Sequence, residues 1–185
     1  MTSAERTAAL LDVVVRIAGA AADCRYLIGG GLAIALHRGA VSRDHEDIDL
    51  FVDRDDIAWW RHIFESWGHR IDRDDYMAFF PGAFVVDDGF AEVWPMVWAP
   101  DGSIRAEPTA DHPGREWWAP LNADAILTTR FRGRDIRVES PDVVIDQKLD
   151  HVRHHRERLA AKHEMDVALL GRTSEYQRLL RELGL

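Results

Sequence analysis

Apolar and polar positions alternate in a way that divides the chain into a mixed first part and a mainly helical last part. Apolar residues recur at helical spacing between Thr2 and Ala22, and Thr2 with Glu5 fits a capping box. The same spacing predicts further helices at 32–37, 54–67 and 140–159, and one or two more from about residue 164. Short apolar runs predict strands at 25–28, 48–52, 69–73, 77–80, 83–86, 90–97, 125–131 and 135–139. The last four strands are expected to form two hairpins, one around 87–89 and one around 132–133.

This order of elements predicts an α/β (α+β) fold, with a small mixed, twisted sheet, flanking helices and a helical C-terminal portion. A boundary near residue 120 separates a core at 1–120 from a hairpin and helices at 121–185, which are expected to pack on that core. The 185 residues suffice for one full hydrophobic core. Residues 98–120, rich in Pro and Trp, are expected to form a loop with short turns.

The charge balance bears on the partners of the protein. A formal net charge of -9 argues against a nucleic-acid binder and suits a cationic or neutral small substrate. Cys24 is the only cysteine, which excludes an intramolecular disulfide and fits a reducing compartment. The N-terminal segment lacks the pattern of a signal peptide or a membrane span. We therefore expect a cytoplasmic protein without a membrane partner.

The segment from Leu27 to Val52 carries the strongest chemical signal in the chain. Three glycines, 29–31, interrupt an apolar strand and lead into a short helical pattern. Asp47 and Asp49 then open a second strand, where alternate side chains share a face and lie ~6.5 Å apart along the backbone. A glycine turn at a helix start admits phosphate, and paired carboxylates bind metal. Together they predict metal-assisted phosphoryl or nucleotidyl transfer.

Two sequence blocks carry a family resemblance. Gly30-Gly31, followed by Ser42-Arg43-x-His45-x-Asp47-Ile48-Asp49, resembles the small antibiotic nucleotidyltransferases that act on aminoglycosides and lincosamides, in the DNA polymerase beta-type superfamily. Ser42 stands where these enzymes have threonine, and Leu32 where they commonly have tryptophan. A second block, Gly133 to Pro141 followed by Lys148 and the segment 165–170, is similar to their later pattern. The glycine-to-carboxylate unit also resembles nucleotidyltransferase toxins.

Three carboxylates are the candidate catalytic and metal-binding residues: Asp47, Asp49 and Glu92. Glu92 is the lone acid in the apolar run 90–94, and directly opposed residues on neighbouring strands lie about 4.5–5.5 Å apart. The resemblance implies the same role, because the family's third carboxylate lies on a later strand. Two ions, Mg²⁺ or Mn²⁺, are expected there. An ion pair with an arginine is the alternative for Glu92, and Asp87 and Asp88 suit a turn better.

The candidate nucleotide-binding residues are Gly30, Gly31, Ser42, Arg43 and Lys148. A guanidinium can neutralise a triphosphate oxygen, and a lysine on the helix that starts at Ser140 can reach a phosphate. Three alternatives stay open: a tight turn at the glycines, a salt bridge from Arg43 to an acid, and a solvated helix lysine at 148. His45 is expected to support the carboxylate loop through hydrogen bonds.

Two other groups of residues have weaker claims. The histidines 151, 154, 155 and 163 alternate with basic residues, which indicates a solvated helix face rather than a metal site. The tryptophans at 94, 98, 117 and 118 suit either an aromatic acceptor pocket or core packing.

The resemblance implies transfer of a nucleoside monophosphate, AMP by preference, from a triphosphate to a hydroxyl of a small molecule, with release of pyrophosphate. An aminoglycoside- or lincosamide-like acceptor implies a role in antibiotic resistance. The alternatives are a toxin-type enzyme acting on tRNA or protein, and an inactive nucleotide-binding module. A monomer and a homodimer are both compatible with the sequence.

Overall fold

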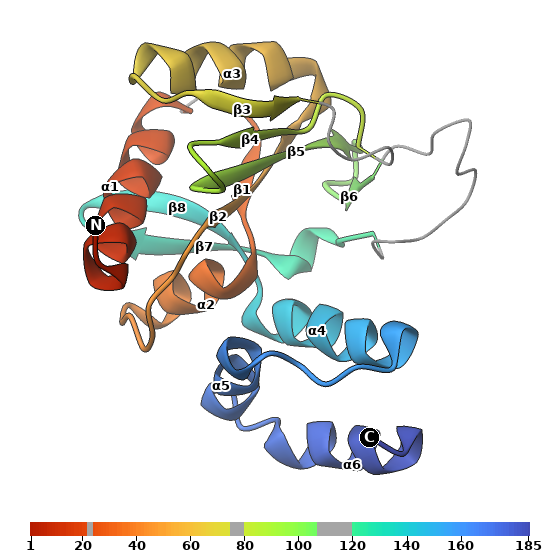
Figure 1. The fold of residues 1–185 in the computed structure, drawn as a ribbon. Coiled ribbons are helices and arrows are strands. Elements are labelled where there is room, and N and C mark those ends of the chain that lie inside the picture. The colour runs from red at the N-terminus through yellow and green to blue at the C-terminus, as the bar shows by residue number, and fades with distance from the viewer. Residues whose placement is uncertain (22–23, 75–79, 107–119) are drawn as a thin grey trace.

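A mixed sheet runs through the computed structural model, which describes residues 1–21, 24–74, 80–106 and 120–185 (Figure 1). Within these residues the sheet has the order β3-β4-β5-β2-β1-β8-β7, and β6 pairs with β5 outside that path. Its strands are β1 Tyr26–Ile28, β2 Ile48–Asp53, β3 Ile71–Asp74, β4 Phe84–Val86, β5 Ala91–Trp98, β6 Ile104–Arg105, β7 Ile126–Phe131 and β8 Arg134–Glu139.

Two parallel contacts set the topology at the centre of the sheet. β2 runs parallel to β5, and β1 runs parallel to β8 but antiparallel to β2. The hairpins β4–β5 and β7–β8 are both antiparallel, as the sequence predicts. The hairpin that follows residue 120 therefore extends the same sheet as the core strands, and the remainder of the chain is helical.

The helices lie around this sheet and beyond one side of it, where α4, α5 and α6 follow one another in blue shades (Figure 1). Their bounds are α1 Ser3–Ala20, α2 Gly30–Arg38, α3 Ile57–Ser66, α4 Pro141–His155, α5 Ala161–Leu169 and α6 Thr173–Leu183, with short 3-10 turns at η1 Arg54–Asp56 and η2 Ala123–Ala125. The mixed sheet with flanking helices confirms the predicted fold class.

Local signals fix some helix ends and not others. At α1 the predicted capping box is present: Glu5 N donates to Thr2 Oγ1 at 3.2 Å, and Thr2 N donates to Glu5 Oε2 at 2.7 Å. The prediction that the helix begun at Ser140 runs to about Leu159 is wrong, because α4 ends at His155 and Arg156 adopts a left-handed conformation at φ 56°. The predicted strand 77–80 lies almost entirely outside the described residues.

The two faces of the sheet carry separate apolar clusters, as alternation along a strand requires. On one face, Ile28, Leu50 and Val52 pack with residues of α1, α2 and α3. On the other face, Phe51 and Trp94 belong to a second cluster, against which a residue of α4 packs. Positions 49 and 92 share this second face, at its edge. The carboxylates of the predicted site are therefore separated from the main core.

Within the described residues, no helix combines the length and the apolar character that crossing a membrane requires.

Phe64 offers a test of the main core. Its side chain is fully buried and its ring lies 6.2 Å from that of Phe84, centroid to centroid. Phe64→Ala is expected to lower the free energy of unfolding, measured with urea, by about 3–5 kcal/mol, because lost burial and an unfilled cavity add. Phe64→Leu removes less volume and should fall between this variant and the unaltered protein. Equal losses for the two variants would contradict the cavity argument.

Candidate active site

Three carboxylates lie where the neighbouring central strands β2 and β5 begin: Asp47, Asp49 and Glu92. Asp49 and Glu92 are direct partners in the register of the parallel strands β2 and β5. Asp47 precedes β2 by one residue, and alternation places it on the same face as Asp49. The structure thus brings together the three carboxylates that the sequence singles out.

The electrostatics of Asp49 reflect this crowding. Burial, followed by the negative charges of Asp47 and Glu92, raises the pKa of Asp49 to about 7, although Lys148 opposes the shift. Desolvation and like charges both disfavour the ionised carboxylate. A bound cation would favour it, so this group of acids is suited to a metal ion.

The glycine turn lies directly against Asp49. Gly30 has φ +62°, and a Cβ there would lie 1.9 Å from Asp49 Oδ2. A Cβ on Gly29 would lie 2.2 Å from Cε2 of Phe51, and one on Gly31 would lie 2.0 Å from Nη2 of Arg43. The turn therefore needs glycine at all three positions for close approach, and at Gly30 also for its backbone conformation.

Glu139 is a residue of this site that the sequence reasoning missed. It ends β8, its side chain is fully buried, and its Oε2 accepts a 3.4 Å hydrogen bond from Gly30 N. Its Oε1 accepts a 2.6 Å hydrogen bond from Gln147 Nε2. Burial raises the pKa of Glu139 to about 7. One sequence signal could have identified Glu139: a charged residue ends an apolar strand directly before the start of a helix.

Arg43 forms a buried salt bridge with Asp166 of α5. Its Nε and Nη2 donate to the two carboxylate oxygens of Asp166 at 2.9 Å each, while Nη1 donates to Asp44 O. The two side chains are only 9% and 3% exposed. Burial would raise the pKa of Asp166, but interactions with His163, Arg43 and Lys148 hold it well below the usual range. This geometry corresponds to the salt-bridge alternative for Arg43.

Lys148 lies between the turn and α5. Its Nζ is 3.6 Å from Asp166 Oδ2 and 2.8 Å from His163 Nδ1. Burial lowers the pKa of Lys148, and the nearby negative charges of Asp166 and Asp49 partly offset this effect. Lys148 is thus a buried cation beside Asp49 rather than a solvated helix lysine.

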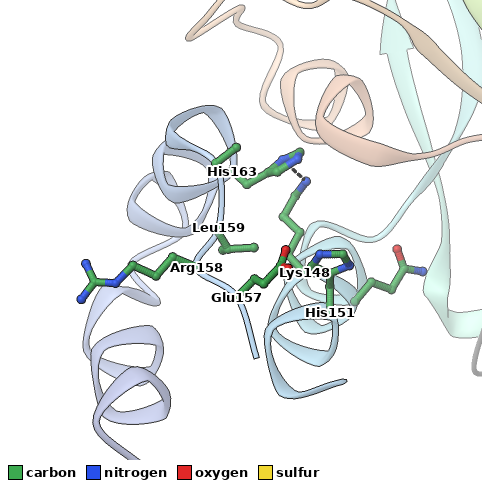
Figure 2. Close-up of a pocket in the computed structure, with 8 residues that line it drawn as sticks. Lys148, His151, Glu157, Arg158, Leu159 and His163 are labelled. Atoms are coloured by element: carbon green, nitrogen blue, oxygen red, sulfur yellow. Dashed lines mark hydrogen bonds between the residues drawn. The ribbon is translucent and has the colours of Figure 1, made fainter. Parts of the chain in front are cut away.

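Two hollows meet at α4. One, of about 200 Å³, is lined by Gly30, Asp49, Phe51, Trp94, Val144, Gln147 and Lys148. The other, of about 440 Å³, lies between α4 and α5 and is shown in Figure 2. Its lining comprises Gln147, Lys148, His151, Glu157, Arg158, Leu159, Ala160 and His163. Gln147 and Lys148 line both hollows, so these two residues lie between the carboxylate site and the hollow beside the C-terminal helices.

The other residues named from the sequence have varied surroundings. Ser42 is exposed in the segment between α2 and β2. His45 is buried; its backbone N donates to Thr7 Oγ1 at 2.8 Å, and its Nε2 has no hydrogen-bond partner among the described residues. His151 and His155 are exposed neighbours on α4 with ring centroids 4.3 Å apart. Trp98 packs against the second apolar cluster, and positions 117 and 118 lie outside the described residues.

Metal ligation has support from the chemistry of the donors. In the part of the chain that the structure describes, no group of three His, Cys, Asp or Glu side chains is arranged so that it could hold a metal ion. Asp49 and Glu92 are nevertheless direct partners in the sheet, and the charges of Asp47 and Glu92 add to burial in raising the pKa of Asp49. Such an oxygen-only set matches the preference of Mg²⁺.

Comparison with known proteins identifies the family. A model of the aminoglycoside-2''-adenylyltransferase family matches residues 10–170. The chain belongs to this family. It is therefore a nucleotidyltransferase, and the resemblance drawn from the glycine and Asp-x-Asp motifs is confirmed. A comparison with curated proteins finds no match.

Solved structures place this family member in the nucleotidyltransferase fold. The antibiotic-resistance factor ANT(2'')-Ia in solution has a TM-score of 0.62 at 21% identity, over 98% of this chain and 92% of that chain. The lincosamide adenylyltransferase LnuA with lincomycin has a TM-score of 0.61 at 21% identity, over 91% and 96%. ANT(2'')-Ia with adenylyl-2''-tobramycin has a TM-score of 0.57 at 20% identity, over 92% and 95%.

Gly30→Ala tests the contact between the turn and Asp49. We expect it to lower the transferase rate at least about 100-fold, because the new methyl group displaces a carboxylate from its working position. Gly39→Ala is the matched control: Gly39 has φ +66° but no atom within 4 Å of its missing Cβ. Both variants pay about 1–2 kcal/mol for the left-handed backbone. Similar activities for the two variants, measured by pyrophosphate release, would contradict the prediction.

Asp166→Asn tests the buried salt bridge. Because the variant leaves Arg43 buried without its charge partner, we expect a loss of about 3–5 kcal/mol in the free energy of unfolding at pH 7. The lowered pKa of Asp166 means that its stabilisation is present above pH ~4 and is lost as the pH falls further. The difference in the free energy of unfolding between the variant and the unaltered protein, measured by urea titration, should therefore become smaller below pH ~4.

Asp135→Asn is the control for this measurement. The Arg130–Asp135 pair also has a 2.8 Å contact, but its side chains are 69% and 63% exposed. Its loss should cost no more than about 1 kcal/mol. A comparable cost for both variants would show that burial of Asp166 contributes nothing to its salt bridge.

Proposed function

We propose that this protein transfers AMP from ATP to a hydroxyl group of a small antibiotic-like molecule, with Mg²⁺ bound by Asp47, Asp49 and Glu92. The observation that carries the proposal is the register of β2 and β5, which pairs Asp49 with Glu92 beside Gly30. Membership of the adenylyltransferase family supports the same reaction.

In the proposed reaction an acceptor hydroxyl oxygen attacks the α-phosphorus of the triphosphate. A new oxygen–phosphorus bond forms, the bond between the α-phosphorus and the bridging oxygen breaks, and pyrophosphate leaves. Glu92 receives the proton of the hydroxyl, and the three carboxylates Asp47, Asp49 and Glu92 would hold the metal. Mg²⁺ bound there would neutralise phosphate charge and favour the ionised form of Asp49. Positioning and charge neutralisation then supply most of the rate enhancement.

The nucleotide phosphates are proposed to lie between the glycine turn and α4. Gly30 and Gly31 present no side chain there, and Lys148 supplies a positive charge beside Asp49. Because Nε and Nη2 of Arg43 both donate to Asp166 of α5, we assign Arg43 to holding α5 against the turn. Ser42, at the exposed entrance to β2, is within the same motif and is proposed to contact the triphosphate.

The acceptor is proposed to be an aminoglycoside- or lincosamide-like compound. Two of the similar structures hold such molecules, lincomycin in LnuA and adenylyl-2''-tobramycin in ANT(2'')-Ia. The acceptor is proposed to bind at the hollow between α4 and α5, which shares the lining residues Gln147 and Lys148 with the carboxylate hollow. Adenylation there would give an antibiotic-resistance function.

Pyrophosphate release with each nucleoside triphosphate and Mg²⁺ tests the proposal, with lincomycin, tobramycin and bulk tRNA as separate acceptors. We expect release that depends on ATP and on an antibiotic, and an at least about 100-fold loss in Asp49→Asn. Removal of Mg²⁺ with EDTA should have the same effect as this substitution.

Asp53→Asn is the matched control, because Asp53 ends the same strand and Asn keeps its hydrogen bond from Asp55 N. This variant should retain full activity. Release with tRNA alone would replace the small-molecule acceptor by a nucleic acid. Nucleotide binding without release for any acceptor would contradict the transferase proposal.

A further inference from the structure

Gln147 occupies the junction of the two hollows, and Glu139 fixes how its amide is oriented. Glu139 Oε1 lies 2.6 Å from Gln147 Nε2, and Glu139 Oε2 accepts from Gly30 N. Above its pKa of about 7 the Glu139 carboxylate is ionised and can only accept hydrogen bonds, so it then faces the NH₂ group of the glutamine. The carbonyl oxygen Oε1 of Gln147 is therefore the atom directed away from Glu139.

This orientation matters because of where Gln147 lies. It lines the hollow that contains Asp49 and also the hollow between α4 and α5. Among the described residues no hydrogen-bond donor contacts Gln147 Oε1. Its neighbour Lys148 is a donor without acceptor capacity. Gln147 Oε1 is thus an acceptor without a donor among the described residues, on a side chain that lines both hollows.

We infer that Gln147 is a specificity-determining residue that accepts a hydrogen bond from a hydroxyl or ammonium group of the acceptor substrate, and that Glu139 is the positioning residue that orients it. The inference rests on the proposed transfer reaction for its substrate. The orientation itself rests only on the contacts of Glu139. It gives the acceptor a chemical requirement: a donor group besides the hydroxyl that reacts.

Glu139→Gln inverts the polarity of this junction with little change of shape. Gly30 N is a donor, so the carbonyl oxygen of the new glutamine at position 139 must face it. The new NH₂ group then faces Gln147, which must turn its own oxygen inward and its NH₂ towards the hollow. A donor replaces an acceptor at the junction, and the donor of the substrate loses its partner.

The double variant Glu139→Gln/Gln147→Glu restores the acceptor. The NH₂ group at position 139 donates to one oxygen of the new carboxylate at position 147, and the other oxygen faces the hollow. The single variant Gln147→Glu instead sets two carboxylates against each other at the position of a 2.6 Å contact. The unaltered protein, the two single variants and the double variant together form a double-mutant cycle.

The first measurement is the urea unfolding of all four proteins at pH 8.5, where Glu139 is ionised given its pKa of about 7. Gln147→Glu should be clearly less stable than the unaltered protein, and the added Glu139→Gln should recover most of that loss. Additive effects of the two substitutions would overturn the inferred pairing, whatever the enzyme transfers.

The second measurement is the kinetics of transfer to the acceptor that the panel of lincomycin and tobramycin identifies. At pH 8.5, Glu139→Gln should raise the KM for that acceptor about tenfold, the cost of one lost hydrogen bond, and by a larger factor than it changes the KM for ATP. The double variant should restore the acceptor KM. An unchanged acceptor KM in Glu139→Gln would overturn the specificity role.

A failure of the proposed function is distinguishable from a failure of this inference. If the unaltered protein transfers AMP to neither antibiotic, the proposed acceptor class is wrong and the specificity role falls with it. The unfolding cycle still decides whether Glu139 orients Gln147. An equal fall of kcat in Glu139→Gln with both acceptors, and no rescue in the double variant, would assign Glu139 a purely structural role.

Discussion

The close approach of side chains to three consecutive glycines is the constraint on which the site depends. Asp49 occupies the space where a side chain at position 30 would begin, and Arg43 does the same at position 31. The turn is thus a contact surface where β2, β8 and α5 meet, and glycine is required by packing as well as by backbone freedom. A wider turn would separate the carboxylates of the site from the C-terminal helices.

The buried carboxylates around this turn differ in whether their surroundings favour or disfavour the ionised form. Asp166 is stabilised as an anion by Arg43 and Lys148, so its charge ties α5 to the core. Asp49 and Glu139 have raised pKa values, because burial outweighs the favourable contacts available to them. A group whose folded-state pKa is raised costs stability when it ionises at higher pH. The surroundings of the turn therefore contain one carboxylate whose charge stabilises the fold and two whose charges lower its stability. A bound cation would offset the charges of these two.

Local patterns predicted those parts of this site that depend on neighbours in sequence. Alternation located β2 and β5, and a lone acid in an apolar strand indicated that Glu92 would lie beside Asp49. The partner of Arg43 could not be predicted in this way, because Asp166 lies 123 residues away along the chain. Glu139 was missed for a similar reason: only the parallel pairing of β1 with β8 brings it under the turn. The end of α4 was misjudged because basic residues favourable to a helix continue past His155.

The connection between β8 and α4 couples the glycine turn to the hollows beside α4. Glu139 is the last residue of β8 and α4 begins at Pro141, so one residue separates the strand that supports the turn from the helix that lines both hollows. Glu139 contacts the turn and, eight residues later, the side chain of Gln147. A shift of α4 relative to the sheet would therefore break a hydrogen bond at the turn as well as at the hollow. Substitutions on the exposed faces of α4 and α5 do not affect the hydrogen bonds of Glu139, since these side chains can change without moving β8. The fold thus leaves the exposed surfaces of α4 and α5 free to vary while the position of the carboxylates stays fixed.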